Sequence, residues 1–132
     1  MRNFLKRVLL VNGVVDICVG AGLVFAPKKF GGFLGFFGLP DYASFLAGGW
    51  GVAALILGFG RITASWDQKK WRLWSLLGLL EGSILAVFCL RYWLGGVLTF
   101  HQVSVPLLIG AVFAICYAAS YPSLRIVVRP KG

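Results

Sequence analysis

Residues 7–26 read RVLLVNGVVDICVGAGLVFA, an apolar run with the acid Asp16 near its middle. A helix of about 20 apolar residues is long enough to cross the hydrocarbon core of a bilayer, which is about 30 Å thick. Three further apolar runs of similar length follow at residues 43–62, 72–95 and 102–121. We therefore expect an all-α integral membrane protein, a four-helix bundle with up-down-up-down topology, formed by residues 1–132 as a single transmembrane domain.

The composition supports this interpretation. The chain has 132 residues, of which 59% are hydrophobic and 13% are charged, whereas soluble domains average about 25% charged residues. Four spans and their short connections leave no room for a soluble domain. The first run is too long for the apolar core of a secretory leader, and it contains an acid, so we expect it to be the first span.

The connection between the first two spans, residues 27–41, reads PKKFGGFLGFFGLPD. Its large residues and its glycines Gly31, Gly35 and Gly38 separate at helical spacing. One interpretation is a short interfacial segment with its rings in the bilayer and its glycines against a neighbouring backbone. The other is an irregular apolar loop, because each glycine costs a helix about 1 kcal/mol. The fold prediction includes the interfacial segment.

The basic residues predict the orientation, since short cytoplasmic loops and tails are enriched in Lys and Arg. The N-terminal segment, the second loop and the C-terminal segment hold most of them: Arg2, Lys6, Arg7, Arg61, Lys69, Lys70, Arg72, Arg125, Arg129 and Lys131. The opposite side holds Lys28, Lys29 and Arg91. We expect both termini on the cytoplasmic side of a bacterial cytoplasmic membrane. The net charge of +9 then favours anionic lipid at that face as a partner, and not nucleic acid.

Asp16 and Glu81 are acids within apolar runs. A charged side chain at the centre of a bilayer costs about 2.5–3.5 kcal/mol and usually faces a bundle interior or a partner. The two acids lie equally deep in spans of the same direction, so they should share one level. We expect no Lys or Arg of this chain at that level. The acids are then either neutral, with Asn12, Ser75 or Ser83 as hydrogen-bond partners, or matched by a proton, a metal cation, an amine ligand or another subunit's base.

Small residues at four-residue or related spacing allow helix backbones to approach closely. They occur on the first, third and fourth spans. The predicted packing positions are Gly13, Gly20, Gly78, Gly82, Gly110, Ala114 and Ala118.

The sequence contains no pattern typical of a catalytic, metal or cofactor site. Cys18, Cys89 and Cys116 lie in different apolar runs without a C-x-x-C pair, so they are expected to be small apolar residues of helices. His101 is the single histidine, which excludes bis-histidine haem ligation within one chain. We expect a protein that is not an enzyme and that has no metal or cofactor.

Residues 21–30, AGLVFAPKKF, and the glycine-rich residues 46–60, LAGGWGVAALILGFG, resemble the DoxX-like group of small four-span bacterial membrane proteins. A basic loop into a third apolar span adds to this resemblance, which covers most of the chain. Some members of the group are similar to membrane subunits of quinone-linked redox enzymes. The resemblance assigns no functional residue here.

The leading functional prediction is a non-catalytic accessory or structural subunit of a larger membrane complex, redox complexes included. It rests on the absence of catalytic apparatus and on buried acids that lack a partner. One alternative is a small homo-oligomeric carrier of a proton-coupled substrate, a cation or an amine, in which Asp16 and Glu81 exchange protons for cargo. A second alternative is an intramembrane receptor for a lipid or an amine.

Overall fold

The computed structural model describes residues 2–127, with side chains described as far as Ser120. The basic side chains of Arg125, Arg129 and Lys131, predicted to lie in a cytoplasmic tail, are outside this part of the chain. The described part is all-α and consists of α1 (Arg2–Phe25), α2 (Pro27–Phe33), α3 (Asp41–Trp66), the 3-10 turn η1 (Gln68–Lys70), α4 (Trp71–Leu94) and α5 (Phe100–Val127). Four of these helices are long and apolar enough to cross a membrane. The four long helices contain the predicted runs to within one residue, but α1 begins five residues earlier, at Arg2, α3 continues four residues further, to Trp66, and α5 continues through Pro122 to Val127.

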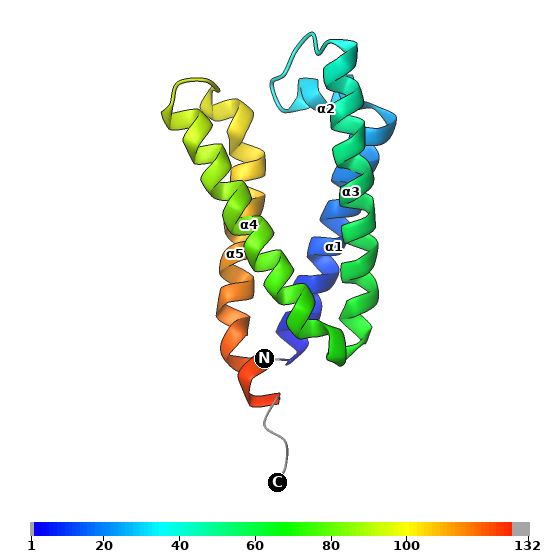
Figure 1. Cartoon of the computed structure of the whole chain (residues 1–132), viewed down its shortest axis with the longest axis vertical. Helices are drawn as coiled ribbons and strands as arrows, with labels where there is room; N and C mark the ends of the chain where they lie inside the picture. The colour runs from blue at the N-terminus through cyan, green and yellow to red at the C-terminus, as the bar shows by residue number, and fades with distance from the viewer. Residues whose placement is uncertain (1, 128–132) are drawn as a thin grey trace.

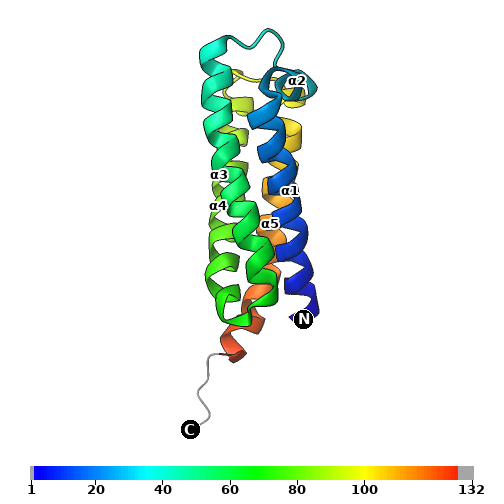
Figure 2. The ribbon, with the colours of Figure 1, turned by 90° about the vertical axis from the view of Figure 1, so that its right-hand side faces the viewer.

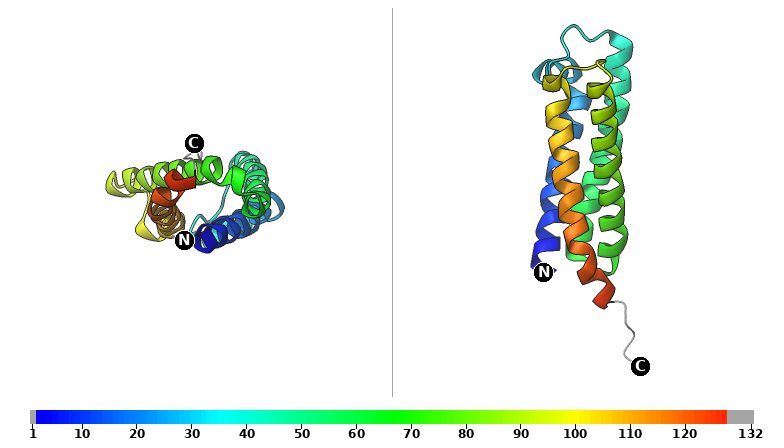
Figure 3. Two further views of the ribbon diagram at one scale, coloured as in Figure 1. Left: turned by 90° about the horizontal axis from the view of Figure 1, so that it is seen from below. Right: turned by 90° about the vertical axis from the view of Figure 1, so that its left-hand side faces the viewer.

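The four long helices form two pairs, which Figure 1 shows side by side. The α1–α3 pair and the α4–α5 pair are each in extensive contact along their length, whereas few residues connect one pair to the other. The pairs approach each other at the end where α1 begins and diverge towards the end that carries α2 (Figure 1). Turned by 90°, the view has one pair in front of the other (Figure 2). Seen along the bundle, the α1–α3 pair and the α4–α5 pair lie on opposite sides of it (Figure 3, left).

Glycines allow the close approach within the α1–α3 pair. A Cβ atom on Gly13 would lie 2.8 Å from the carbonyl oxygen of Gly58, and a Cβ on Gly20 would lie 2.7 Å from that of Gly51. Real Cβ atoms essentially never approach another atom this closely. The two contacts follow opposite orders along the two helices, so α1 and α3 are antiparallel. Gly13 and Gly20, two of the predicted packing positions, therefore lie against α3.

The α4–α5 pair has a similar contact between Gly82 and Gly110. A Cβ on Gly82 would lie 2.6 Å from the Gly110 carbonyl oxygen and 3.0 Å from the backbone nitrogen of Ala114, while Gly78 faces the ring of Tyr117. Ala118, another predicted packing position, is exposed and makes no such contact within the described part of the chain. Tyr117 fills the position against Gly78.

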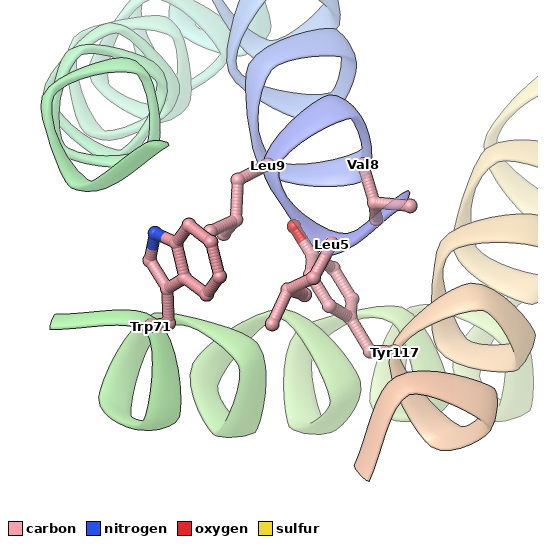
Figure 4. Packing of buried hydrophobic residues seen from close by; sticks show 5 residues of the cluster. All are labelled: Leu5, Val8, Leu9, Trp71 and Tyr117. Atoms are coloured by element: carbon pink, nitrogen blue, oxygen red, sulfur yellow. The ribbon is translucent and has the colours of Figure 1, made fainter. Parts of the chain in front are cut away.

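The apolar core lies where the two pairs meet, at the end where α1 begins (Figure 4). Leu5, Val8 and Leu9 of α1 pack there against Trp71 of α4 and Tyr117 of α5. The indole Nε1 of Trp71 donates a hydrogen bond of 2.9 Å to the carbonyl oxygen of Ala64 in α3, so this end of the bundle connects all four long helices.

The segment between α1 and α3 is partly helical. The helix α2 ends at Phe33, and Gly35 and Gly38 beyond it have φ values of +85° and +68°, a conformation that other residues rarely adopt. These two glycines therefore shape a turn and are not on a helix face as predicted. The side-chain amide nitrogen of Gln102 at the start of α5 donates to the carbonyl oxygen of Gly35 at 3.2 Å, which fixes the segment over that end of the bundle.

Large apolar side chains cover the outer surface of the bundle. Midway along their helices, Ile56, Ile84 and Leu108 have relative exposures of 66%, 66% and 65%. A soluble monomer rarely exposes continuous apolar surface of this kind. This surface is suited to contact with hydrocarbon.

Candidate functional site

The candidate site is centred on Arg61. The sequence prediction counted this residue with the basic second loop, but α3 continues to Trp66 and places Arg61 more than one turn inside the helix. The arginine has a relative exposure of 0%. A fully buried arginine is rare unless it is paired, and its neighbours provide that pairing.

Arg61 forms ion pairs with both of the acids that stand out in the sequence. Its Nη1 donates to a carboxylate oxygen of Asp16 on α1, and its Nη2 donates to a carboxylate oxygen of Glu81 on α4. We call these three residues the ion triad. The expectation that the acids share one level agrees with their common partner. The expectation that no base of this chain reaches that level is wrong.

Local helix geometry explains why Arg61 points inward. In an α-helix the Cα–Cβ bond tilts towards the N-terminus, which for Arg61 is the direction of Gly58. A Cβ on Gly58 would lie 3.0 Å from the Cβ of Asp16, so this direction leads the guanidinium to the acid. Arg61 also shares the helix face of Gly51 and Gly58, the face that contacts α1. This shared face is the sequence signal that could have identified Arg61.

The members of the triad differ in accessibility. The side chains of Arg61 and Asp16 are 1% and 13% exposed, whereas that of Glu81 is 41% exposed. The Nε of Arg61 has no hydrogen-bond partner among the described residues. With all three groups ionised the triad carries one net negative charge, and an uncompensated charge in apolar surroundings is unfavourable. Glu81 is thus the acid best placed to meet an additional cation.

The other predicted polar residues are separate from the ion pairs. Asn12 is buried, and its Nδ2 donates a hydrogen bond of 2.9 Å to the hydroxyl of Tyr117. Ser75 is buried, and its hydroxyl has no partner among the described residues. Ser83 is exposed and takes no part in the site. The acids are paired by Arg61, and no described hydrogen bond connects them to Asn12, Ser75 or Ser83.

A cavity of about 210 Å³ lies beside the triad, in the space between the two helix pairs. We call it the central cavity, and residues of α1, α2, α3, α4 and α5 line it. Its described lining is apolar apart from Asn12, Asp16 and Glu81. Phe30 of α2 and the adjacent Leu34 line it as well, so the α2 segment contributes to its wall. An apolar cavity with a few convergent polar groups is the usual form of a small-molecule site.

A second space of about 500 Å³ lies between α3 and α4, and we call it the lateral groove. Its lining is apolar except for Glu81. Trp50, Ala54 and Glu81 line both the lateral groove and the central cavity, so the two spaces adjoin at these side chains. Trp50 is 70% exposed. The triad is therefore close to the outer surface of the bundle on the side between α3 and α4.

Among the described residues, no group of three or more His, Cys, Asp and Glu side chains could hold a metal ion. No family model, no curated protein and no solved structure matches the chain. The groups that the site offers to a ligand are two carboxylates on one guanidinium, with an apolar cavity beside them.

Proposed function

We propose that the protein is a four-span membrane protein that binds a small amphipathic molecule with a cationic amine headgroup inside the bundle. One observation carries this proposal: Glu81, the partly exposed one of two carboxylates that share a single guanidinium, lies where the central cavity adjoins the lateral groove. An ammonium group at Glu81 would balance the charge of the triad, and an apolar tail would fit the apolar lining.

The lateral groove supports a route to this site from the bilayer. It lies between α3 and α4, which belong to different helix pairs and have few contacts with each other. Trp50, Leu46 and Leu80 line the groove and are exposed, and the helix surfaces around it also carry exposed large hydrophobic residues. An amphipathic molecule dissolved in hydrocarbon would thus reach Glu81 without crossing an aqueous phase.

The proposal includes an orientation. We place the four long helices across a bacterial cytoplasmic membrane in up-down-up-down order with both termini cytoplasmic. Although Arg61 is not in the loop, the excess of basic residues on this side remains, because Lys69 and Lys70 lie between α3 and α4 and Arg72 lies in the first turn of α4. Reporter fusions at the C-terminus and after Gly96 test this arrangement. A cytoplasmic reporter signal after Gly96 would overturn it.

The binding test uses the purified protein in a neutral detergent and dodecyltrimethylammonium as the probe. Binding is followed by the fluorescence of Trp50, with a Trp50→Phe variant to identify the signal of that indole. Dodecanol and tetramethylammonium serve as the matched probes that lack the charge or the tail. We expect the amphipathic cation to bind more tightly than either one.

The decisive variant is Glu81→Gln, which removes the charge and keeps the shape of the side chain. Amine affinity should fall about tenfold, since the pair is intermediate between a surface and a buried ion pair. The matched control is Asp41→Asn, because the Asp41 side chain is 95% exposed and paired with Lys28, away from the cavity. Equal loss in both variants, or no loss in Glu81→Gln, would count against the proposal.

The accessory-subunit prediction and the carrier prediction remain to be tested. The first rested partly on acids without a partner, and Arg61 now supplies that partner within the chain. The second requires a cation to compete with Arg61 for Glu81 and then to cross the bundle. Native mass spectrometry after mild extraction tests the first prediction, and pH-driven uptake into vesicles tests the second.

A further inference from the structure

A separate polar cavity of about 370 Å³ lies at the end of the bundle where α1 begins. Arg2, Asn3 and Lys6 of α1 line one side of it, and Trp66 and Gln68 line the side formed by the α3–α4 connection. We call this cavity the basic pocket. It is at the opposite end of the bundle from α2 (Figure 1), and it shares no lining residue with the central cavity.

The positive charge of the basic pocket is not compensated by the described residues around it. Arg2 and Lys6 are four residues apart on α1, so both side chains are on the same face. No acidic residue lines the pocket. The nearest acid in the sequence, Asp67, accepts a hydrogen bond of 3.1 Å from the backbone nitrogen of Lys69 and pairs with Lys70 at 3.5 Å. Arg2 donates to the side-chain oxygen of Gln68, which holds its guanidinium at the pocket.

We propose that the basic pocket binds the phosphate headgroup of an anionic phospholipid. Arg and Lys side chains with neighbouring amide donors are suited to phosphate oxygens. Trp66 at the rim is 65% exposed, and an exposed indole is typical of the headgroup level of a bilayer. The apolar helix surfaces that begin beside the pocket would contact the acyl chains, which a free phosphate ion lacks. This site rests on the proposed membrane placement but not on an amine ligand in the central cavity.

The test measures binding of dioctanoyl phosphatidylglycerol to the purified protein by native mass spectrometry. Dioctanoyl phosphatidylcholine and inorganic phosphate are the comparison probes. We expect the anionic lipid to bind more tightly than both. Arg2→Gln combined with Lys6→Gln should weaken its binding about thirtyfold, because each basic group near an anionic headgroup is worth about fivefold. The matched control, Lys69→Gln with Lys70→Gln, should change it at most a few-fold.

The single variant Lys6→Gln, with an expected loss of about fivefold, keeps the test decisive if the double variant unfolds. Unchanged lipid binding in the folded double or single variant would overturn the proposal. So would equal binding of phosphatidylcholine, or inorganic phosphate that competes as well as the lipid at equal concentration. Amine binding measured on the same samples separates the two proposals, since failure at the basic pocket leaves the effect of Glu81→Gln unchanged.

Discussion

Arg61 of α3 donates a hydrogen bond to Glu81 of α4, and this ion pair joins the two helix pairs beside the central cavity. The same guanidinium is bonded to Asp16 within its own pair. At the end where α1 begins, the apolar core and the bond of Trp71 to Ala64 join the pairs, and at the other end Gln102 of α5 bonds to Gly35. The triad is thus both the polar part of the candidate site and a link between two halves that diverge around it.

Removal of Arg61 should destabilise the fold more than removal of the whole triad. Arg61→Leu leaves two carboxylates near each other in apolar surroundings, and the loss of one partner of a buried ion pair costs about 3–5 kcal/mol. We expect about 3 kcal/mol here, since Glu81 is partly exposed. Arg61→Leu combined with Asp16→Asn and Glu81→Gln should regain most of this stability. The measurement is unfolding in mixed micelles of neutral detergent and dodecyl sulfate, followed by circular dichroism.

A triple variant that is less stable than Arg61→Leu would contradict this explanation. In that case the arginine stabilises the bundle by packing and not by neutralising the acids.

The glycine contacts between α1 and α3 predict that alanine has opposite effects on stability at two glycines of α3, Gly58 and Gly49. A Cβ on Gly58 would lie 2.7 Å from the carbonyl oxygen of Gly13, whereas nothing lies within 4 Å of a Cβ on Gly49. Gly58→Ala should therefore destabilise the protein by about 1–3 kcal/mol through overpacking. Gly49→Ala should stabilise α3 by up to about 1 kcal/mol, because alanine has the higher helix propensity. Equal effects in the same unfolding assay would show that the backbones are not in close contact.

The hydrogen bond between Asn12 and Tyr117 predicts a coupling energy across the bundle. The donor nitrogen and the hydroxyl oxygen are 2.9 Å apart and buried. Hydrogen bonds between membrane helices contribute about 0.6 kcal/mol on average and about 1.7 kcal/mol at most. A double-mutant cycle of Asn12→Ala and Tyr117→Phe should give a value in this range. The control pair is Asn12→Ala with Trp71→Phe. No described hydrogen bond joins Asn12 to Trp71, so the effects of these two substitutions on stability should be additive.

A large side chain placed where the central cavity adjoins the lateral groove should block ligand entry without disturbing the ion triad. Ala54 lines both the central cavity and the lateral groove. Ala54→Phe should thus reduce binding of dodecyltrimethylammonium about as strongly as Glu81→Gln does, but it should reduce dodecanol binding as well. Val52 lines neither space and is 50% exposed, so Val52→Phe is the matched control. Undiminished binding in Ala54→Phe would place the ligand elsewhere.

The helical content and the four long helices could be predicted because they depend on local properties of the chain. Apolar runs of the required length occur in the sequence, and α1, α3, α4 and α5 contain them. The packing role of Gly13 could also be predicted, since close helix contact depends on small residues. Its partner could not, because the same stripe could face any neighbouring helix, and the structure places it against α3.

The sequence alone predicted that two acids lie at one level of the apolar helices, because each is nine residues from the start of its predicted span. It could not establish how they are neutralised. Arg61 is close to the end of its predicted span, where a long basic side chain can turn outward to the headgroups or inward to the bundle. That choice depends on Asp16 and Glu81 from two other helices, whose approach is a property of the packed bundle. Only the packing of α1, α3 and α4 therefore shows that the base between the two acids is Arg61 of this chain.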